Sequence, residues 1–148
     1  MSSIKSQLLE VCFTHVNKRI ANYKNELETI KDSIENNDKG DEENDSGNGK
    51  LFNDLEKNAQ YLSDASKMLD TLKTINSKAI HQNAVLGSLI TTDISKFYLA
   101  VSIGKIEIDN ENYFIISKSS PIGELLLNKT VGESITFNNT TYNIKEIR

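Results

Sequence analysis

Apolar side chains recur along the first part of the chain in alternating steps of four and three residues. Lys, Asn, Glu and Asp fill most of the positions between them, with no Gly or Pro. This spacing forms one stripe on an α-helix, as in the seam of a coiled coil. It predicts one amphipathic helix over about residues 4–35, roughly 45 Å long. The stripe consists of Leu9, Phe13, Val16, Ile20, Tyr23, Leu27, Ile30 and Ile34.

A second stripe of similar length follows, and Met68 and Ile75 widen it. Two such helices, joined in one chain, bury their stripes most simply against each other, which predicts an antiparallel helical hairpin. Asn58 and Asn76 weaken the packing on this stripe but can fix its register. Pairing with a second chain, as in a coiled-coil dimer, remains open. The stripe consists of Leu51, Leu55, Asn58, Leu62, Ala65, Leu69, Leu72, Asn76 and Ala79.

The segment between the two stripes, residues 36–49, contains no apolar residue and is expected to be a flexible connector. From Glu35 to Asp45 there are six acidic residues and one Lys, a local charge of −5 in a chain whose net charge is −4. The negative charge is therefore concentrated at the predicted tip of the hairpin, near residues 36–50.

After about His81 the pattern changes to short β-branched or aromatic runs, which predict strands. Residues 109–112 are expected to form a turn, and residues 138–140 to connect a β-hairpin. We therefore expect an α+β protein with a helical hairpin at 1–82 and a small antiparallel β domain at 83–148. The strand candidates lie within residues 85–90, 96–101, 113–116, 135–137 and 142–144.

Residues 120–128 have the features of a short helix. Ser120 is a good N-cap, and Pro121 suits the first helical position, where its missing N–H does no harm. Ile122, Leu125 and Leu126 are expected to face the sheet, with Asn128 ending the helix in the left-handed conformation.

Composition excludes several kinds of protein. The net charge of −4 and pI of about 5.2 give little support to unaided nucleic-acid binding. Cys12 is the only cysteine, which excludes an internal disulfide and predicts a buried thiol. No stretch approaches the ~20 apolar residues of a membrane helix, so a cytoplasmic protein is expected. His15 and His81 suggest no metal site, and no nucleophile–base arrangement indicates an enzyme.

The stretch from Ser117 to Glu133 closely resembles the C-terminal signature of the bacterial GreA/GreB family of transcription elongation factors. That pattern has Ser, two variable residues, Ser-Pro, an aliphatic residue and Ala or Gly, followed by two apolar positions and a Gly-Asp or Gly-Glu turn. Leu125 departs from it, because the family has a small residue there. The resemblance implies an FKBP-like fold for the C-terminal domain. The matching positions are Ser117, Ser120, Pro121, Ile122, Gly123, Leu126, Leu127, Gly132 and Glu133.

Residues 54–61 resemble the family's hairpin-tip motif, in which Asp-Leu, a variable residue and Glu precede Asn-Ala-Glu-Tyr. Asp54 matches the tip aspartate. Lys57 stands in the place of the tip glutamate, and Glu56 lies one residue early. With the connector acids, the resemblance makes these the candidates for presenting a metal: Asp41, Glu42, Glu43, Asp45, Asp54 and Glu56.

The resemblance implies a non-enzymatic monomer that binds bacterial RNA polymerase through its secondary channel and comes near the nascent RNA. Its acids would share a Mg²⁺ ion with the polymerase active site and promote cleavage of backtracked transcripts, with no cofactor of its own. The alternative is a channel regulator or inhibitor without cleavage. A third hypothesis, peptidyl-prolyl isomerisation, needs a deep aromatic pocket, and fold alone does not confer that activity.

Overall fold

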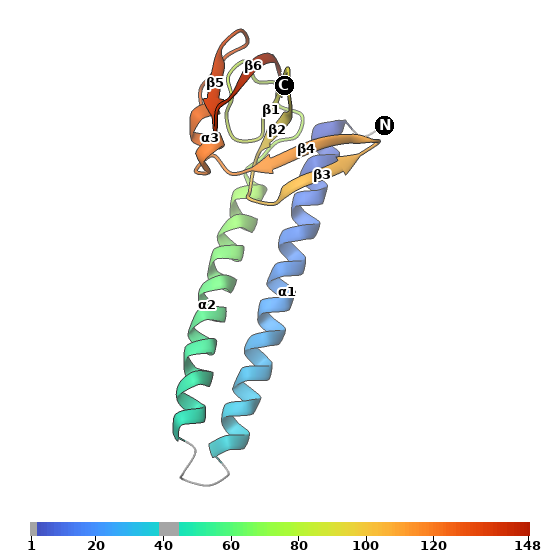
Figure 1. Cartoon of the computed structure of the whole chain (residues 1–148). Helices are drawn as coiled ribbons and strands as arrows, with labels where there is room; N and C mark the ends of the chain where they lie inside the picture. The colour runs from blue at the N-terminus through green and yellow to red at the C-terminus, as the bar shows by residue number, and fades with distance from the viewer. Residues whose placement is uncertain (1–2, 39–44) are drawn as a thin grey trace. The chain divides into compact units, whose positions relative to one another are not determined.

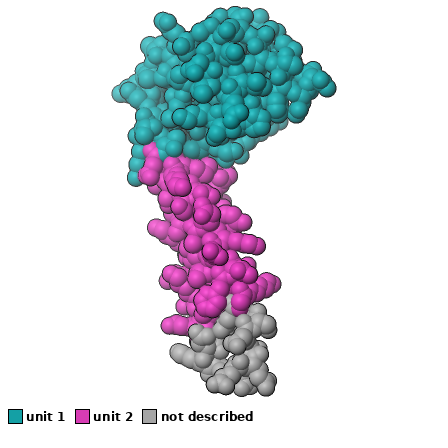
Figure 2. Space-filling view, turned by 90° about the vertical axis from the view of Figure 1, so that its left-hand side faces the viewer, with its two compact units in different colours: residues 1–13, 71–148 teal, residues 14–70 magenta. Residues whose placement is uncertain are grey.

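The computed structural model describes residues 3–38 and 45–148, except for the side chains of residues 37, 38 and 45–48. The chain forms two compact units, which Figure 2 shows in different colours. Unit 1 comprises residues 1–13 and 71–148, and unit 2 comprises residues 14–70. Unit 1 thus contains the first residues of the helical region together with the sheet, and the predicted domain boundary at 82/83 stays a prediction.

Two long helices, α1 (Ile4–Asp38) and α2 (Asp45–Lys73), form the predicted antiparallel hairpin (Figure 1). Within unit 2 the rings of Tyr23 and Tyr61 lie 5.5 Å apart between centroids. Farther from the connector, Nη1 of Arg19 lies 3.8 Å from Sδ of Met68. Arg19 precedes Tyr23 on α1, whereas its partner Met68 follows Tyr61 on α2, so the two helices run in opposite directions. Over the described residues, no helix is both long and apolar enough to cross a membrane.

The helices begin and end at different residues from those predicted. Residues 36–38 and 45–49 of the expected connector are helical, and residues 39–44 lie outside the described residues. Each residue added to an existing helix gains a hydrogen bond, which offsets a glycine penalty of about 1 kcal/mol. At its other end α2 stops at Lys73, before Ala79. There the hydroxyl of Thr74 donates to the carbonyl of Thr71 over 2.7 Å.

The side-chain hydrogen bonds of the two seam asparagines, Asn58 and Asn76, stay within their own segment and do not cross the hairpin. Nδ2 of Asn58 donates to the carbonyl of Asp54 over 2.9 Å, and Oδ1 of Asn76 accepts from the N–H of Lys78 over 3.0 Å. Contacts near the helix ends do cross the hairpin. In unit 1, Nζ of Lys5 donates to the carbonyl of Ala79 over 2.7 Å. This long-range bond, and not an asparagine, constrains the register there.

The buried stripe of α1 shifts in unit 1. Leu8 and Cys12 are fully buried, whereas Leu9 and Phe13, the predicted seam residues, are half-buried. Here α1 packs within a unit that also holds the sheet, so the face that points inward is no longer set by α2 alone. The predicted burial of Cys12 is confirmed, and this burial raises the pKa of its thiol to about 12.

A six-stranded sheet and one short helix, α3 (Pro121–Leu126), make up the rest of unit 1 (Figure 1). The predicted α+β class is confirmed. The sheet is mixed and not purely antiparallel, because β2 and β4 are parallel neighbours. Its order is β3-β4-β2-β1-β6-β5. The strands are β1 (Leu89–Thr92), β2 (Lys96–Leu99), β3 (Gly104–Ile108), β4 (Glu111–Ile116), β5 (Ser134–Phe137) and β6 (Thr140–Ile147).

The central strands of the sheet, β1 and β2, are buried on both faces. Phe97, Tyr98 and Leu99 are consecutive and all buried, although successive strand residues point to opposite faces. On one face, Phe97 and Leu99 join a core cluster that includes Leu126 of α3. The opposite face carries Tyr98. This double burial explains why the strand reads as a continuous apolar run instead of an alternating one.

The backbone angles agree with the two turns predicted at residues 109–112 and 138–140. Asp109 and Asn110 connect β3 to β4 with φ values of 52° and 66°, and Asn138 and Asn139 connect β5 to β6 with 50° and 64°. Two successive positive φ values are typical of the tight loops that match strand twist. Two details were wrong: β3 was not expected, and Val85–Ser88 is a turn, closed by the Ser88 N–H donating to the Val85 carbonyl over 3.0 Å.

Candidate functional site

The signature segment begins with a tightly bonded N-cap. The Ser120 hydroxyl accepts from the N–H of Gly123 over 3.1 Å and donates to the carbonyl of Ser117 over 2.7 Å. Pro121 occupies the first turn of α3, as predicted. Ser117 and Ser120 therefore work as a pair, since one supplies the carbonyl that orients the hydroxyl of the other.

Gly123 fits where no larger residue does. A Cβ atom there would lie 2.0 Å from the backbone oxygen of Ser117 and 2.8 Å from Oγ of Ser120. Gly123 is buried, and Ile122 beside it packs against the core cluster of the sheet. The glycine thus allows α3 to start directly on top of the Ser117 carbonyl.

The segment after α3 is held by backbone bonds and a carboxylate. Asn128 has φ 66°, so it ends the helix in the left-handed conformation as predicted, and its N–H donates to the carbonyl of Ala84 over 2.7 Å. Gly132 has φ 95°. Oε2 of Glu133 then accepts from the N–H of Thr130 over 2.7 Å, and this bond lowers the pKa of the Glu133 carboxyl.

Leu125 was expected to face the sheet, and it does not. Its side chain is 39% exposed, whereas Leu126 is fully buried. In a helix of one and a half turns only a narrow stripe can reach the sheet, and Ile122 and Leu126, four positions apart, occupy it. Position 125 consequently has room for a large side chain.

The acidic candidates fall into two groups. Asp41, Glu42 and Glu43 lie outside the described residues, and Asp45 begins α2 with a side chain that is likewise outside them. Asp54 is half-buried and Glu56 is exposed, both on α2. Two residues apart on a helix, these two carboxylates point to different sides.

Lys57 and Asn58, unlike Glu56, share the side of the helix on which Asp54 lies, because they follow it by three and four positions. Helix spacing therefore places the positive charge of Lys57 on the same side of the helix as Asp54. Among the described residues, no three His, Cys, Asp or Glu side chains gather as metal ligands. That Asp54 and Glu56 share a Mg²⁺ ion with the active site of a partner stays a prediction.

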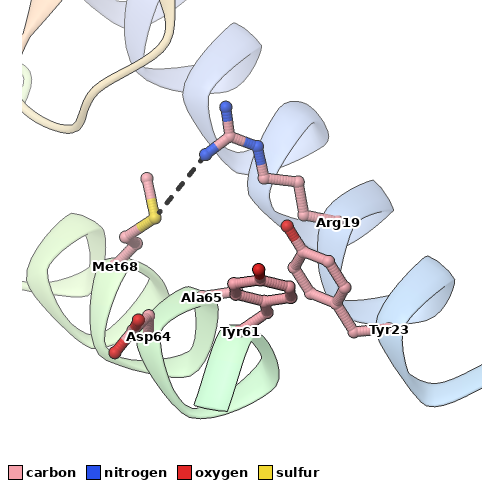
Figure 3. A pocket seen from close by; sticks show the side chains of 6 residues that line it. All are labelled: Arg19, Tyr23, Tyr61, Asp64, Ala65 and Met68. Carbon is pink, nitrogen blue, oxygen red and sulfur yellow. Dashed lines mark hydrogen bonds between the residues drawn. The ribbon is translucent and has the colours of Figure 1, made fainter. Parts of the chain in front are cut away.

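A small cavity of about 180 Å³ lies in unit 2 between the two helices (Figure 3). Arg19 and Tyr23 reach it from α1, and Tyr61 and Met68 from α2. Asp64 lies at its edge, where Oδ1 accepts from Nε2 of Gln60 over 2.9 Å. Sequence reasoning did not single out this cavity. The sequence feature that could have indicated the cavity is Tyr61, an aromatic residue that lies outside the seam stripe, at the end of the tip-like motif. The structure shows Tyr61 to be 48% exposed.

Comparisons with known proteins found a distant likeness to a solved structure. No family model and no curated protein sequence matches the chain. One similar solved structure is the crystal structure of GreA factor homolog 1 (Gfh1) protein of Thermus thermophilus. The match has 14% identity, covers 92% of this chain and 94% of that one, and has a TM-score of 0.36. A score this low carries no conclusion, so function has to be inferred from the residues themselves.

Proposed function

We propose that this protein binds RNA polymerase as a Gre-type factor, with the helical hairpin entering the secondary channel. One observation carries the proposal: the signature positions of the Gre family are filled by residues with specific structural tasks. Gly123 is the clearest, because a Cβ atom would lie 2.0 Å from the Ser117 oxygen. Ser120 and Glu133 support it with their capping bonds.

The hairpin suits a narrow channel. Each helix offers one apolar stripe, both stripes are used between α1 and α2, and the outer faces are mostly polar, with Phe52 and Tyr61 as exposed aromatic residues. The segment from Glu35 to Asp45, with a charge of −5, would favour a Mg²⁺-rich catalytic centre over nucleic acid alone. Mg²⁺ held there with the polymerase would help to activate water for hydrolysis of the RNA backbone.

Two modes of action follow, and they differ in the acids they need. Promotion of transcript cleavage requires carboxylates at the tip, for which the candidates are Asp41, Glu42, Glu43, Asp45, Asp54 and Glu56. Regulation by occupying the channel requires no carboxylate at the tip. The second mode is favoured by Lys57, which lies on the same helix side as Asp54, while Glu56 lies on another.

Binding is tested first with purified protein and the cognate core polymerase, by co-elution in size-exclusion chromatography and by cross-linking. The proposal expects a 1:1 complex whose cross-links map to the secondary channel. Failure to co-elute at micromolar concentration, or cross-links confined to the polymerase exterior, would reject it.

The mode of action is tested on stalled, backtracked elongation complexes. The variant D41N/E42Q/E43Q/D45N is compared with a control that neutralises four other hairpin acids, E26Q/E28Q/D64N/D70N. If the protein promotes cleavage, the first variant binds but loses stimulation, while the control keeps both. If the wild-type protein slows multi-round transcription without shortening the RNA, the channel-occupying mode is correct.

A further inference from the structure

A hollow of about 460 Å³ lies in unit 1, away from the signature segment. Its walls come from the first turn of α1 and from the segment after α2. Ile4, Ala79 and Ile80 supply apolar surface, and Lys5, Lys78 and Arg148 supply positive charge. This volume lies within the range of small-molecule sites, which combine mostly apolar walls with a few polar groups.

The positive charges in this hollow are incompletely matched. Nζ of Lys5 donates to the carbonyl of Ala79 over 2.7 Å, which uses one of its three N–H groups, and its side chain is only 6% exposed. Burial and the nearby Arg148 charge lower the pKa of Lys5. Within the described part of the chain, the one carboxylate paired with any of these cations is Glu146, 3.0 Å from Arg148. A bound anion would relieve the repulsion between Lys5 and Arg148.

The apolar side of the hollow is also incompletely covered. Ile80 is 90% exposed, the largest exposed fraction among the large apolar side chains described. A bare inorganic anion would leave Ile80 and Ile4 in water, and a neutral apolar molecule would leave the cations without a counter-charge. Only a ligand with both features satisfies the whole lining.

We propose that this hollow binds a small amphipathic carboxylate, with an aliphatic or aromatic body of roughly six to ten carbon atoms. The carboxylate lies against Lys5 and Lys78, and the body covers Ile4 and Ile80. Such a ligand ties the first turn of α1 to residues 77–80 and stabilises unit 1. The inference does not depend on polymerase binding.

The test is an NMR titration of the full ¹⁵N-labelled chain with octanoate, and with octanol and inorganic phosphate as comparison probes. We expect octanoate to shift the amides of Lys5 and residues 77–80, but not those of Tyr23 and Tyr61. We expect it to bind at least about tenfold more tightly than either comparison probe. Shifts spread evenly over the surface, or phosphate binding as tightly as octanoate, would overturn the proposal.

Two charge reversals at exposed lysines provide the matched pair. Lys78→Glu should weaken octanoate binding by about tenfold, because it replaces an attractive charge with a repulsive one. Lys105→Glu on β3 makes the same change in net charge away from the hollow and should leave binding unchanged. An equal loss in both variants would mean that net charge alone attracts octanoate, and no specific site exists. Ile80→Ser, which removes apolar contact and keeps every charge, should also weaken octanoate binding.

Discussion

The helical hairpin of unit 2 and the sheet-containing unit 1 bury their apolar residues to very different extents. In the described part of unit 2, the buried hydrophobic residues are Val16, Ile30, Ile34 and Ala65, and the other seam positions are half-buried. Unit 1 has a continuous core in which Ile90, Leu99 and Leu126 are fully buried. A helix that packs against one neighbour leaves the side chains beside its seam partly exposed to solvent, whereas central strands covered on both faces bury their side chains completely. The core of unit 1 should therefore dominate stability.

The largest expected effect is a core truncation in unit 1. Leu126→Ala should lower the free energy of unfolding by about 2–5 kcal/mol, because the side chain is fully buried. The matched change on the hairpin seam, Leu62→Ala, should cost about 1 kcal/mol because Leu62 is half-buried. Urea unfolding followed by circular dichroism measures both. Equal costs would mean that the two units do not differ in the way described above.

A glycine-to-alanine pair should give opposite signs in the two units. Gly123→Ala should destabilise unit 1 by about 1–3 kcal/mol, since its Cβ would collide with the Ser117 carbonyl. Gly49→Ala should stabilise α2 by about 0.5–1 kcal/mol, because nothing lies within 4 Å of the added Cβ. Melting temperatures of the two variants check both signs. A neutral Gly123→Ala would remove the structural explanation of the signature glycine.

The N-cap of α3 should have a smaller effect. Ser120→Ala removes the hydroxyl that accepts from Gly123, which should cost about 1 kcal/mol. Ser120→Asp keeps an acceptor at the cap and should recover part of the loss. Amide hydrogen exchange at Gly123 and Glu124 reports the cap directly. Unchanged exchange in Ser120→Ala would contradict the assigned role.

The smallest expected effect is on how folding stability depends on pH. It comes from the two histidines, of which His15 lies in unit 2 and His81 in unit 1. Burial is the main cause that lowers the pKa of both His15 and His81, with help from nearby cations. The folded state therefore binds fewer protons than the unfolded state, whose histidine pKa is about 6.5. The stability that the two neutral histidines contribute should be fully present above about pH 6.5 and should fall as the pH drops below that value. The double variant H15Q/H81Q should flatten this fall, and histidine titration by NMR should give midpoints below about 6.5. Midpoints above that value would reverse the sign.

Features that depend on neighbouring residues were predicted well. The stripes of α1 and α2 within unit 2, the Ser120 cap, Asn128 as the end of α3 and both Asn-containing hairpin loops all follow from interactions within a few positions. The candidate metal ligands stay a prediction. The spacing of Asp54 and Glu56 places them on different sides of a helix, whereas Asp41, Glu42, Glu43 and the side chain of Asp45 lie outside what the structure describes.

The sequence by itself determined the two amphipathic helices, the turns and the cap, because each is selected by local dihedral preferences and by hydrogen bonds between near neighbours. Only the tertiary structure decided which face of α1 is buried at Leu8 and Cys12, that β2 and β4 are parallel, and that β3 forms an edge strand. It also revealed that Gly123 is required by the Ser117 carbonyl. These features arise from contacts between distant segments, where packing outweighs local preference.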